Sequence, residues 1–139
     1  KLSQNIAKNK NLEIYYINQR YSRYSFLKNT ICDAGPEDFV SLLRNADCVC
    51  TDSFHGTLFS IIFQKDFYTF VDSQKSHDRR RQDMLLKLDL MDRCIFLDDI
   101  VISKSCIDYD DVQLKLSKFR KNSLNFLRSS IVDVEMSYE

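Results

Sequence analysis

Six consecutive residues, Asp52 to Thr57, carry the side chains best suited to chemistry on an anionic substrate. Ser53, His55 and Thr57 place two hydroxyls and an imidazole around one expected strand-to-helix turn. Gly56 has no β-carbon, which would let the backbone approach a ligand closely. Such a turn could bind a phosphate or carboxylate and offer a proton donor beside it. The structural alternative is that His55 only caps its helix and Gly56 only eases packing.

A basic segment follows the next apolar run, Phe67 to Val71, and contains Lys75 and the three arginines Arg79 to Arg81. The carboxyl ends of parallel strands meet at one edge of a sheet, so we expect this segment on the same rim as His55. Lys75 and Arg81 are candidates to bind substrate, because a phosphate or carboxylate in a partly dry cleft needs paired cations. The alternative is a solvated basic loop that contacts nothing.

Strands and helices alternate along the chain, which indicates βαβ units and a mostly parallel sheet. We therefore predict an α/β, Rossmann-like three-layer domain with four or five strands and with Ala46 to Thr51 as the central strand. The expected strands are Leu12 to Ile17, Asn29 to Cys32, Ala46 to Thr51, Phe67 to Val71 and Cys94 to Leu97. The expected helices run from Gly35-Pro36 to Asn45, from a cap at Asp52 or Ser53 through Phe63, from Arg81 to Leu88, and from Tyr109 to Ser130.

Length and composition restrict the possibilities further. With 139 residues, 44% of them hydrophobic, the chain can bury one core, which predicts a single domain over residues 1–139. Twenty basic residues balance twenty acidic ones, so the overall charge gives no case for a nucleic-acid partner, and any anion site must be local. The chain lacks an apolar run of the roughly 20 residues that a membrane span requires. We expect a cytoplasmic location, with peripheral attachment at the inner face of the membrane as an alternative.

The five cysteines form an odd set in a chain rich in core residues, which favours reduced thiols over a disulfide framework. Cys48 and Cys50 alternate within an apolar run, and no second cysteine pair or histidine cluster accompanies them. The sequence therefore predicts no metal site.

Three blocks of the sequence together resemble the polysaccharide pyruvyl transferase family. They are Gly35-Pro36-Glu37-Asp38-Phe39, Asn45-Ala46-Asp47, and the run from Thr51 to Phe63, which contains Ser53-Phe54-His55-Gly56. The likeness continues weakly to about residue 97, through the spacing of Arg81 to Leu85-Leu86 and through Leu90 to Arg93. The Ser-Phe-His-Gly block is its specific part.

This resemblance implies an enzyme that moves a pyruvyl group from phosphoenolpyruvate to two hydroxyls of a sugar, as a ketal, in building bacterial surface polysaccharide such as capsule or exopolysaccharide. By similarity His55 donates the proton or binds the donor phosphate, while Ser53, Gly56, Thr57, Lys75 and Arg81 are the candidate substrate-binding residues. Imidazole suits the acid role because it exchanges protons near neutral pH. No cofactor is expected besides the donor substrate, and the acceptor would be a saccharide or a lipid-linked saccharide.

The resemblance also implies a two-domain, glycosyltransferase-B-like enzyme, of which this chain would be the carboxyl-terminal half. The chain starts at Lys1 rather than at Met, so we expect a missing amino-terminal domain and an inactive fragment. Two other functions stay open at this point: the donor half of a nucleotide-sugar glycosyltransferase, and a non-catalytic binding fragment.

Overall fold

The computed structural model describes residues 2–17, 28–72, 78–96 and 105–136. The chain forms two compact units, Lys1–Thr69 and Phe70–Glu139, and the boundary between them falls inside strand β4 (Asp66–Val71). The prediction of one domain over residues 1–139 stays a prediction.

The first unit alternates helices and short parallel strands. Its elements are α1 (Leu2–Lys10), β1 (Tyr16–Ile17), β2 (Thr30–Ile31), α2 (Pro36–Asn45), β3 (Cys48–Thr51), α3 (Phe54–Ile62) and the first part of β4. Strand β1 pairs with β2 in parallel, and β3 pairs with β4 in parallel with Val49 opposite Phe67. The predicted α/β class with parallel strands is therefore confirmed, and the arrangement is consistent with a Rossmann-like fold.

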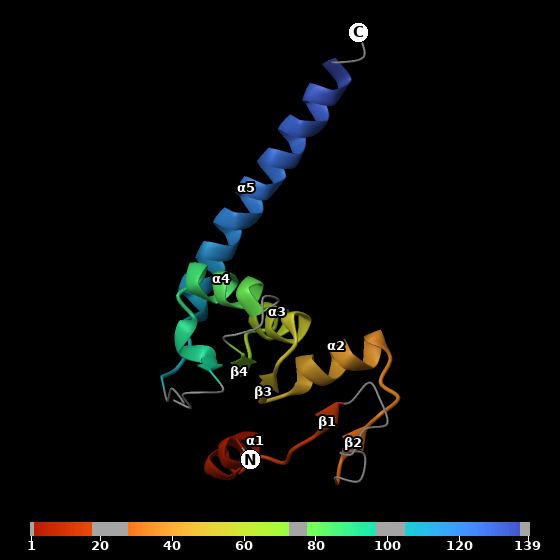
Figure 1. Cartoon of the computed structure of the whole chain (residues 1–139), viewed down its shortest axis with the longest axis vertical. Coiled ribbons are helices and arrows are strands. Elements are labelled where there is room, and N and C mark those ends of the chain that lie inside the picture. Colours follow the sequence, from red (N-terminus) through yellow and green to blue (C-terminus); the bar gives the residue numbers. More distant parts are fainter. Residues whose placement is uncertain (1, 18–27, 73–77, 97–104, 137–139) are drawn as a thin grey trace. The chain divides into compact units, whose positions relative to one another are not determined.

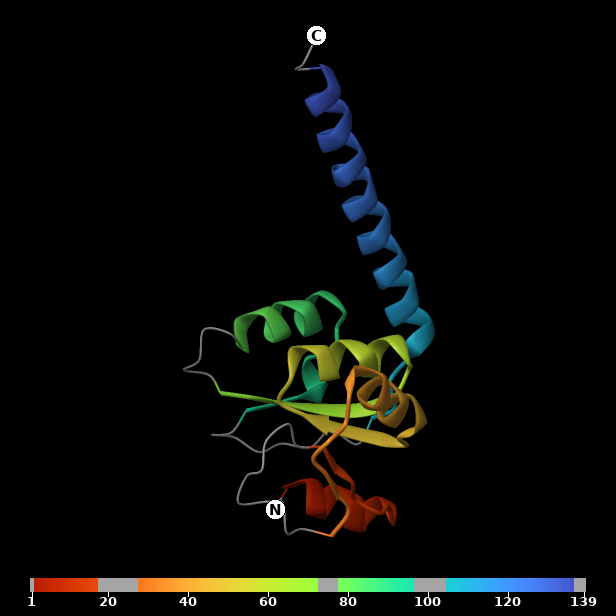
Figure 2. The same cartoon turned by 90° about the vertical axis from the view of Figure 1, so that its right-hand side faces the viewer.

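Two helices flank the β3–β4 ladder of the first unit. Helix α3 covers one side of the ladder and α1 lies on the other, as both views show (Figures 1 and 2). Helix α1 is attached by an ion pair between Lys10 Nζ and Asp66 Oδ2 at 2.6 Å and buries Ile6 and Ala7. The pKa of Lys10 is raised, chiefly because its ammonium donates to the Asp66 carboxylate.

Helix α2 begins and ends where its sequence predicts. Pro36 occupies the first turn, where its missing N–H costs nothing, and the Asp38 carboxylate accepts a hydrogen bond from the Gly35 N–H at 3.0 Å. The helix packs against α3, with the rings of Phe39 and Phe59 edge to face and their centroids 6.3 Å apart. This contact fixes α2 beside the helix that carries His55.

The expectation that Ala46 to Thr51 forms the central strand is wrong for the described residues. The described strand order is β3–β4–β5, which places β4 in the middle. Burial explains the difference: Phe67, Tyr68, Thr69 and Val71 of β4 are all buried, whereas Val49 is the buried residue of β3.

The second unit contains α4 (Arg79–Lys87), a short 3-10 helix (η2, Met91–Arg93), β5 (Cys94–Phe96) and α5 (Tyr109–Met136). Its core is aliphatic and includes Leu85, Leu88, Leu90, Ile95 and Val112, each at most 4% exposed. The first turns of α5 are attached through buried Val112 and through Lys115, whose ammonium donates to the carboxylates of Asp89 and Asp111. Within the described part of the chain, no helix is long and apolar enough to cross a bilayer.

Most predicted elements are present, although the first three strands are shorter than expected. The strand predicted over Leu12 to Ile17 is reduced to Tyr16–Ile17, and that over Asn29 to Cys32 to Thr30–Ile31. Helix α1 was not predicted, because its mainly polar sequence offers few apolar positions beyond Ile6 and Ala7.

Candidate active site

Ser53 starts helix α3 and organises the turn that carries His55. Its backbone is extended, and its Oγ accepts a hydrogen bond from the Gly56 N–H at 3.3 Å. Its carbonyl oxygen accepts from the Thr57 N–H at 3.0 Å, and its own N–H donates to Thr51 Oγ1 at 3.0 Å. Of the two predicted caps, Asp52 and Ser53, the structure selects Ser53. The turn is thus held by its own hydrogen bonds, from the last residue of β3 to the first turn of α3.

Gly56 is buried and lies against the end of β3. A β-carbon at this position would lie 2.4 Å from Thr51 Oγ1 and 3.1 Å from Thr51 Cβ, distances that real contacts do not allow without movement. The absent side chain therefore permits α3 to pack against Thr51. The packing explanation for this glycine is the one that the geometry supports, and a ligand contact by Gly56 stays a prediction.

Thr57 is fully buried and bonded inside the first unit. Its hydroxyl donates to the Ser53 carbonyl oxygen at 3.0 Å and shares a hydrogen bond with the hydroxyl of Thr69, also at 3.0 Å. Thr69 belongs to β4 and is fully buried as well. The pair ties α3 to the neighbouring strand, so the contacts seen for Thr57 are structural, and its proposed contact with substrate stays a prediction.

His55 differs from its neighbours because its side chain is exposed. It is the second residue of α3, so the predicted position at a helix amino terminus is confirmed. Its ring meets the Phe54 ring edge to face, with centroids 5.8 Å apart and planes at 83°. Ser53, Gly56 and Thr57 therefore fix the backbone from which an accessible imidazole projects.

Arg81, which was expected with Lys75 to bind the substrate, lies in the second unit and is buried, with 4% of its surface exposed. Its guanidinium donates to Asp78 Oδ1, and Asp78 Oδ2 accepts the Asp72 N–H at 2.7 Å. Arg79 to Arg81, expected in a loop, form the first turn of α4, a correction that follows from the helix starting two residues earlier than predicted. The rim predicted for His55 and Arg81 joins the two units and stays a prediction. Lys75 lies outside the described residues.

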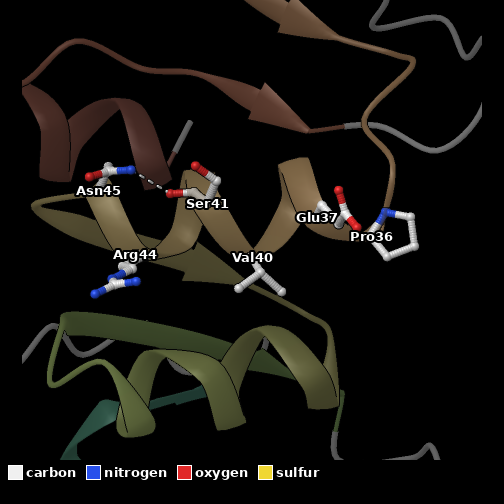
Figure 3. A pocket seen from close by; sticks show the side chains of 6 residues that line it. All are labelled: Pro36, Glu37, Val40, Ser41, Arg44 and Asn45. Carbon is white, nitrogen blue, oxygen red and sulfur yellow. Dashed lines mark hydrogen bonds between the residues drawn. The ribbon is translucent and has the colours of Figure 1, made fainter.

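An open depression of about 740 Å³ lies along α2 of the first unit. Figure 3 shows Val40 and Arg44 on the side of α2 that faces α3, with Ser41 and Asn45 on the other side. The Asn45 amide donates to the Ser41 carbonyl oxygen at 2.9 Å. His55 does not line this depression, so the two features are separate candidates for ligand contact.

The five cysteines are free thiols in the structure, and the described residues contain no group of histidine, cysteine and carboxylate side chains that could hold a metal ion. The pKa of Cys50 is raised by its hydrogen bond with the Cys48 thiol and by burial. Burial also raises the pKa of Cys94, to about 11. Both changes keep these thiols protonated, and therefore weak as nucleophiles and as metal ligands.

Three residues that contact the candidate side chains were not singled out from the sequence. Thr51 receives the Ser53 N–H and contacts Gly56, Thr69 meets Thr57, and Asp78 pairs with Arg81. Only Asp78 carried a sequence signal, an acid three residues before an arginine at the start of a helix. The two threonines act through contacts between β-strands and α3, which residue type does not reveal.

Comparison with protein families matches residues 2–74 to the polysaccharide pyruvyl transferase family. Comparisons with curated proteins and with solved structures gave no match. The matched region covers more than half of the chain and includes α1, the whole of the Ser53 to Thr57 turn and β4, whereas Lys75 and Arg81 lie beyond it. With the α/β fold and the exposed histidine at the start of α3, this match shows that the chain belongs to the polysaccharide pyruvyl transferase family.

Proposed function

We propose that this protein transfers the pyruvyl group of phosphoenolpyruvate to two hydroxyls of a saccharide, forming a ketal. The observation that carries the proposal is the position of His55, exposed at the amino end of α3 inside the region that matches the family. A helix amino terminus favours anions, because its dipole and its first N–H groups are positive. The donor, with a phosphate and a carboxylate, suits such a place.

In the proposed reaction His55 supplies the proton that the donor's methylene carbon must gain. One sugar hydroxyl adds to the neighbouring carbon, and its proton returns His55 to the protonated imidazolium form. The bond from that carbon to the phosphate oxygen then breaks, the second hydroxyl adds, and its proton leaves with the phosphate. The overall change converts an enol phosphate and two hydroxyls into a ketal and inorganic phosphate, without an oxidant or cofactor. A histidine can perform both proton steps, which favours it over a permanently charged side chain.

The other candidate residues enter the proposal in two ways. Ser53, Gly56 and Thr57 hold the turn, and a substrate contact by any of them would come from its backbone or from the Ser53 hydroxyl. Lys75 and Arg81 are proposed to neutralise the donor, although Arg81 would have to do so while paired with Asp78. An amino-terminal domain in a glycosyltransferase-B-like arrangement, a lipid-linked saccharide acceptor, a bacterial source and a cytoplasmic location belong to the same proposal.

The test compares His55→Ala with Arg44→Ala in the enzyme supplied with phosphoenolpyruvate and acceptor. Ketal formation and phosphate release should fall by roughly 10² to 10⁴ for His55→Ala, the usual contribution of general acid catalysis. Because the imidazole is exposed, His55→Ala should change the protein's free energy of unfolding by no more than about 0.5 kcal/mol. Arg44, exposed at the α2 depression, represents the competing candidate site, and Arg44→Ala should leave turnover unchanged if the donor binds beside His55.

Near-normal ketal formation by His55→Ala would refute the proposed role of His55. A loss confined to Arg44→Ala would move the donor site to α2. Titration of the chain with a nucleotide sugar in place of phosphoenolpyruvate addresses the donor itself: binding of the nucleotide sugar alone would contradict pyruvyl transfer.

A further inference from the structure

Among the described residues, helix α5 leaves a long exposed stretch, which Lys87 of α4 contacts near its start with Nζ 5.9 Å from the centre of the Phe119 ring. From Ser117 to Ile131 every residue is exposed, although the same helix is anchored at its start by buried Val112. Fifteen residues of isolated helix are marginally stable in water, and helices in proteins normally gain stability by packing an apolar face. The segment Ser117 to Ile131, called the free segment below, is therefore a surface that a partner would cover.

Large apolar side chains lie on one sector of the free segment. Leu124, Leu127 and Ile131 follow the spacing i, i+3, i+7 and are 51%, 54% and 61% exposed. Phe119 and Phe126, seven residues apart and 39% and 70% exposed, lie about 80° to 100° further around the helix from Leu127, so the five side chains form one wide apolar sector. Together they leave on the order of 500 Å² of apolar surface in water, more than scattered surface residues normally expose.

The charges of the free segment all have one sign. It contains Lys118, Arg120, Lys121 and Arg128 and no acidic residue; the nearest acids in the sequence are Asp111 before it and Asp133 after it. At 3.6 residues per turn the five apolar residues together span about 160° of the helix circumference, and Lys118, Lys121 and Arg128 fall outside that sector, with Arg128 beside its Leu124 edge. Arg120 falls within the apolar sector, where its long stem can lie along apolar surface while its charge reaches water.

We propose that the free segment of α5 binds the surface of a bilayer that contains anionic phospholipid. An apolar face with Phe and Leu and a polar face rich in Lys and Arg is the pattern of helices that lie in the plane of a membrane interface. The four cations complement anionic headgroups, and the apolar sector enters the boundary between headgroups and acyl chains. The overall charge of the chain is zero, so this attraction is local to α5.

Two other occupants fit the same residues less well. A second copy that packed through the apolar sector would enclose Arg120 of each helix in the contact, and burying a charge without a carboxylate partner is costly. A nucleic acid would neutralise the cations but would leave the exposed Leu, Phe and Ile side chains in water. The inference does not depend on the proposed enzymatic function and would stand if that function were refuted.

The experiment measures co-sedimentation of the full 139-residue chain with vesicles of phosphatidylcholine alone and of phosphatidylcholine with phosphatidylglycerol. The chain should bind only the anionic vesicles, and raising the salt from low concentration to about 0.5 M should release it, because surface charges are then screened. Lys118→Gln/Lys121→Gln should weaken the partition by roughly 30-fold. Leu127→Ser should weaken it by on the order of 10-fold through loss of apolar burial.

Matched variants outside the free segment test whether a loss of vesicle binding is specific to that segment. Lys8→Gln/Lys28→Gln removes the same charge from exposed sites of the first unit, and Leu86→Ser replaces a leucine that is 64% exposed on α4. Both controls should bind like the unaltered chain. Glutamine is a good helix former, so the charge variant should keep the helical circular dichroism of α5.

Absence of binding to anionic vesicles would overturn the proposal, as would equal losses in the controls and in the free-segment variants. Self-association that Leu127→Ser abolishes, measured by light scattering in the absence of lipid, would assign the surface to a second copy instead.

Discussion

Replacing Gly56 with alanine should destabilise the first unit, because the turn has no space for a methyl group. The new Cβ would lie 2.4 Å from Thr51 Oγ1, 3.1 Å from Thr51 Cβ and 3.2 Å from Thr51 Cγ2. Thr51 is short and branched at Cβ, so rotation about its side chain moves one of its two branches but not the Cβ itself. Rotation would also withdraw Oγ1 from the Ser53 N–H, which it now accepts at 3.0 Å.

Three contributions set the size of the effect. Overpacking a buried site costs about 1 to 3 kcal/mol. Loss of the hydrogen bond from Ser53 to Thr51 adds about 1 kcal/mol. Alanine in place of glycine inside a helix returns about 1 kcal/mol. We therefore expect Gly56→Ala to lower the free energy of unfolding by about 1 to 3 kcal/mol.

A double-mutant cycle isolates the contact. In a Thr51→Ala background both branches of the threonine are gone, and the remaining Cβ contact of 3.1 Å needs a shift of a few tenths of an ångström. Gly56→Ala should then be close to neutral, which gives a coupling free energy of at least about 1 kcal/mol between positions 51 and 56. Urea unfolding followed by far-ultraviolet circular dichroism measures all four members.

Gly35→Ala is the matched control for this cycle. A Cβ on Gly35 would meet Asp38 Oδ2 at 3.5 Å, an ordinary contact, so its effect should add to that of Thr51→Ala without coupling. A neutral Gly56→Ala variant in the unaltered background, or equal effects of Gly56→Ala with and without Thr51, would refute the packing explanation for Gly56.

Three further predictions concern the buried ion pair and the thiols. Asp78→Ala should destabilise the second unit by about 3 to 5 kcal/mol in urea unfolding because it breaks the buried ion pair with Arg81, and Arg81→Met should also be destabilising. The double variant should cost clearly less than the sum of the two single variants, and additive costs would contradict the pairing. At pH 8 the exposed Cys106 should be alkylated rapidly. Buried Cys94, with its pKa raised to about 11, should react at least about a hundredfold more slowly than an ordinary thiol until the pH rises towards 11. Fast labelling of Cys94 at pH 8 would refute its burial. Thiol counting on the denatured, unreduced chain should find all five cysteines, and a lower count would reveal a disulfide.

Local signals in the sequence were sufficient for the parts of the fold that depend on neighbours along the chain. Pro36 and Asp38 mark the start of α2, and α2 ends at the predicted Asn45. The polar residue before an apolar helical stripe identified the start of α3 and placed His55 in its first turn. Periodicity likewise indicated the long helix α5, six residues short of its actual end. Helix caps and the spacing of apolar residues along a helix depend on residues within one or two turns of each other, which is why the sequence alone reveals them.

The tertiary structure decided what each polar side chain contacts. The sequence presents Ser53, Gly56 and Thr57 as equal candidates for ligand binding, yet Thr57 is bonded to Thr69 of another strand and Gly56 lies against Thr51. Arg81, expected to face substrate, is buried with Asp78. Burial likewise placed β4 rather than β3 in the middle of its sheet, and left Ser117 to Ile131 of α5 uncovered. A hydroxyl or a guanidinium can serve a ligand or the protein's interior equally well, and the choice depends on neighbours that the folded chain brings together across many residues.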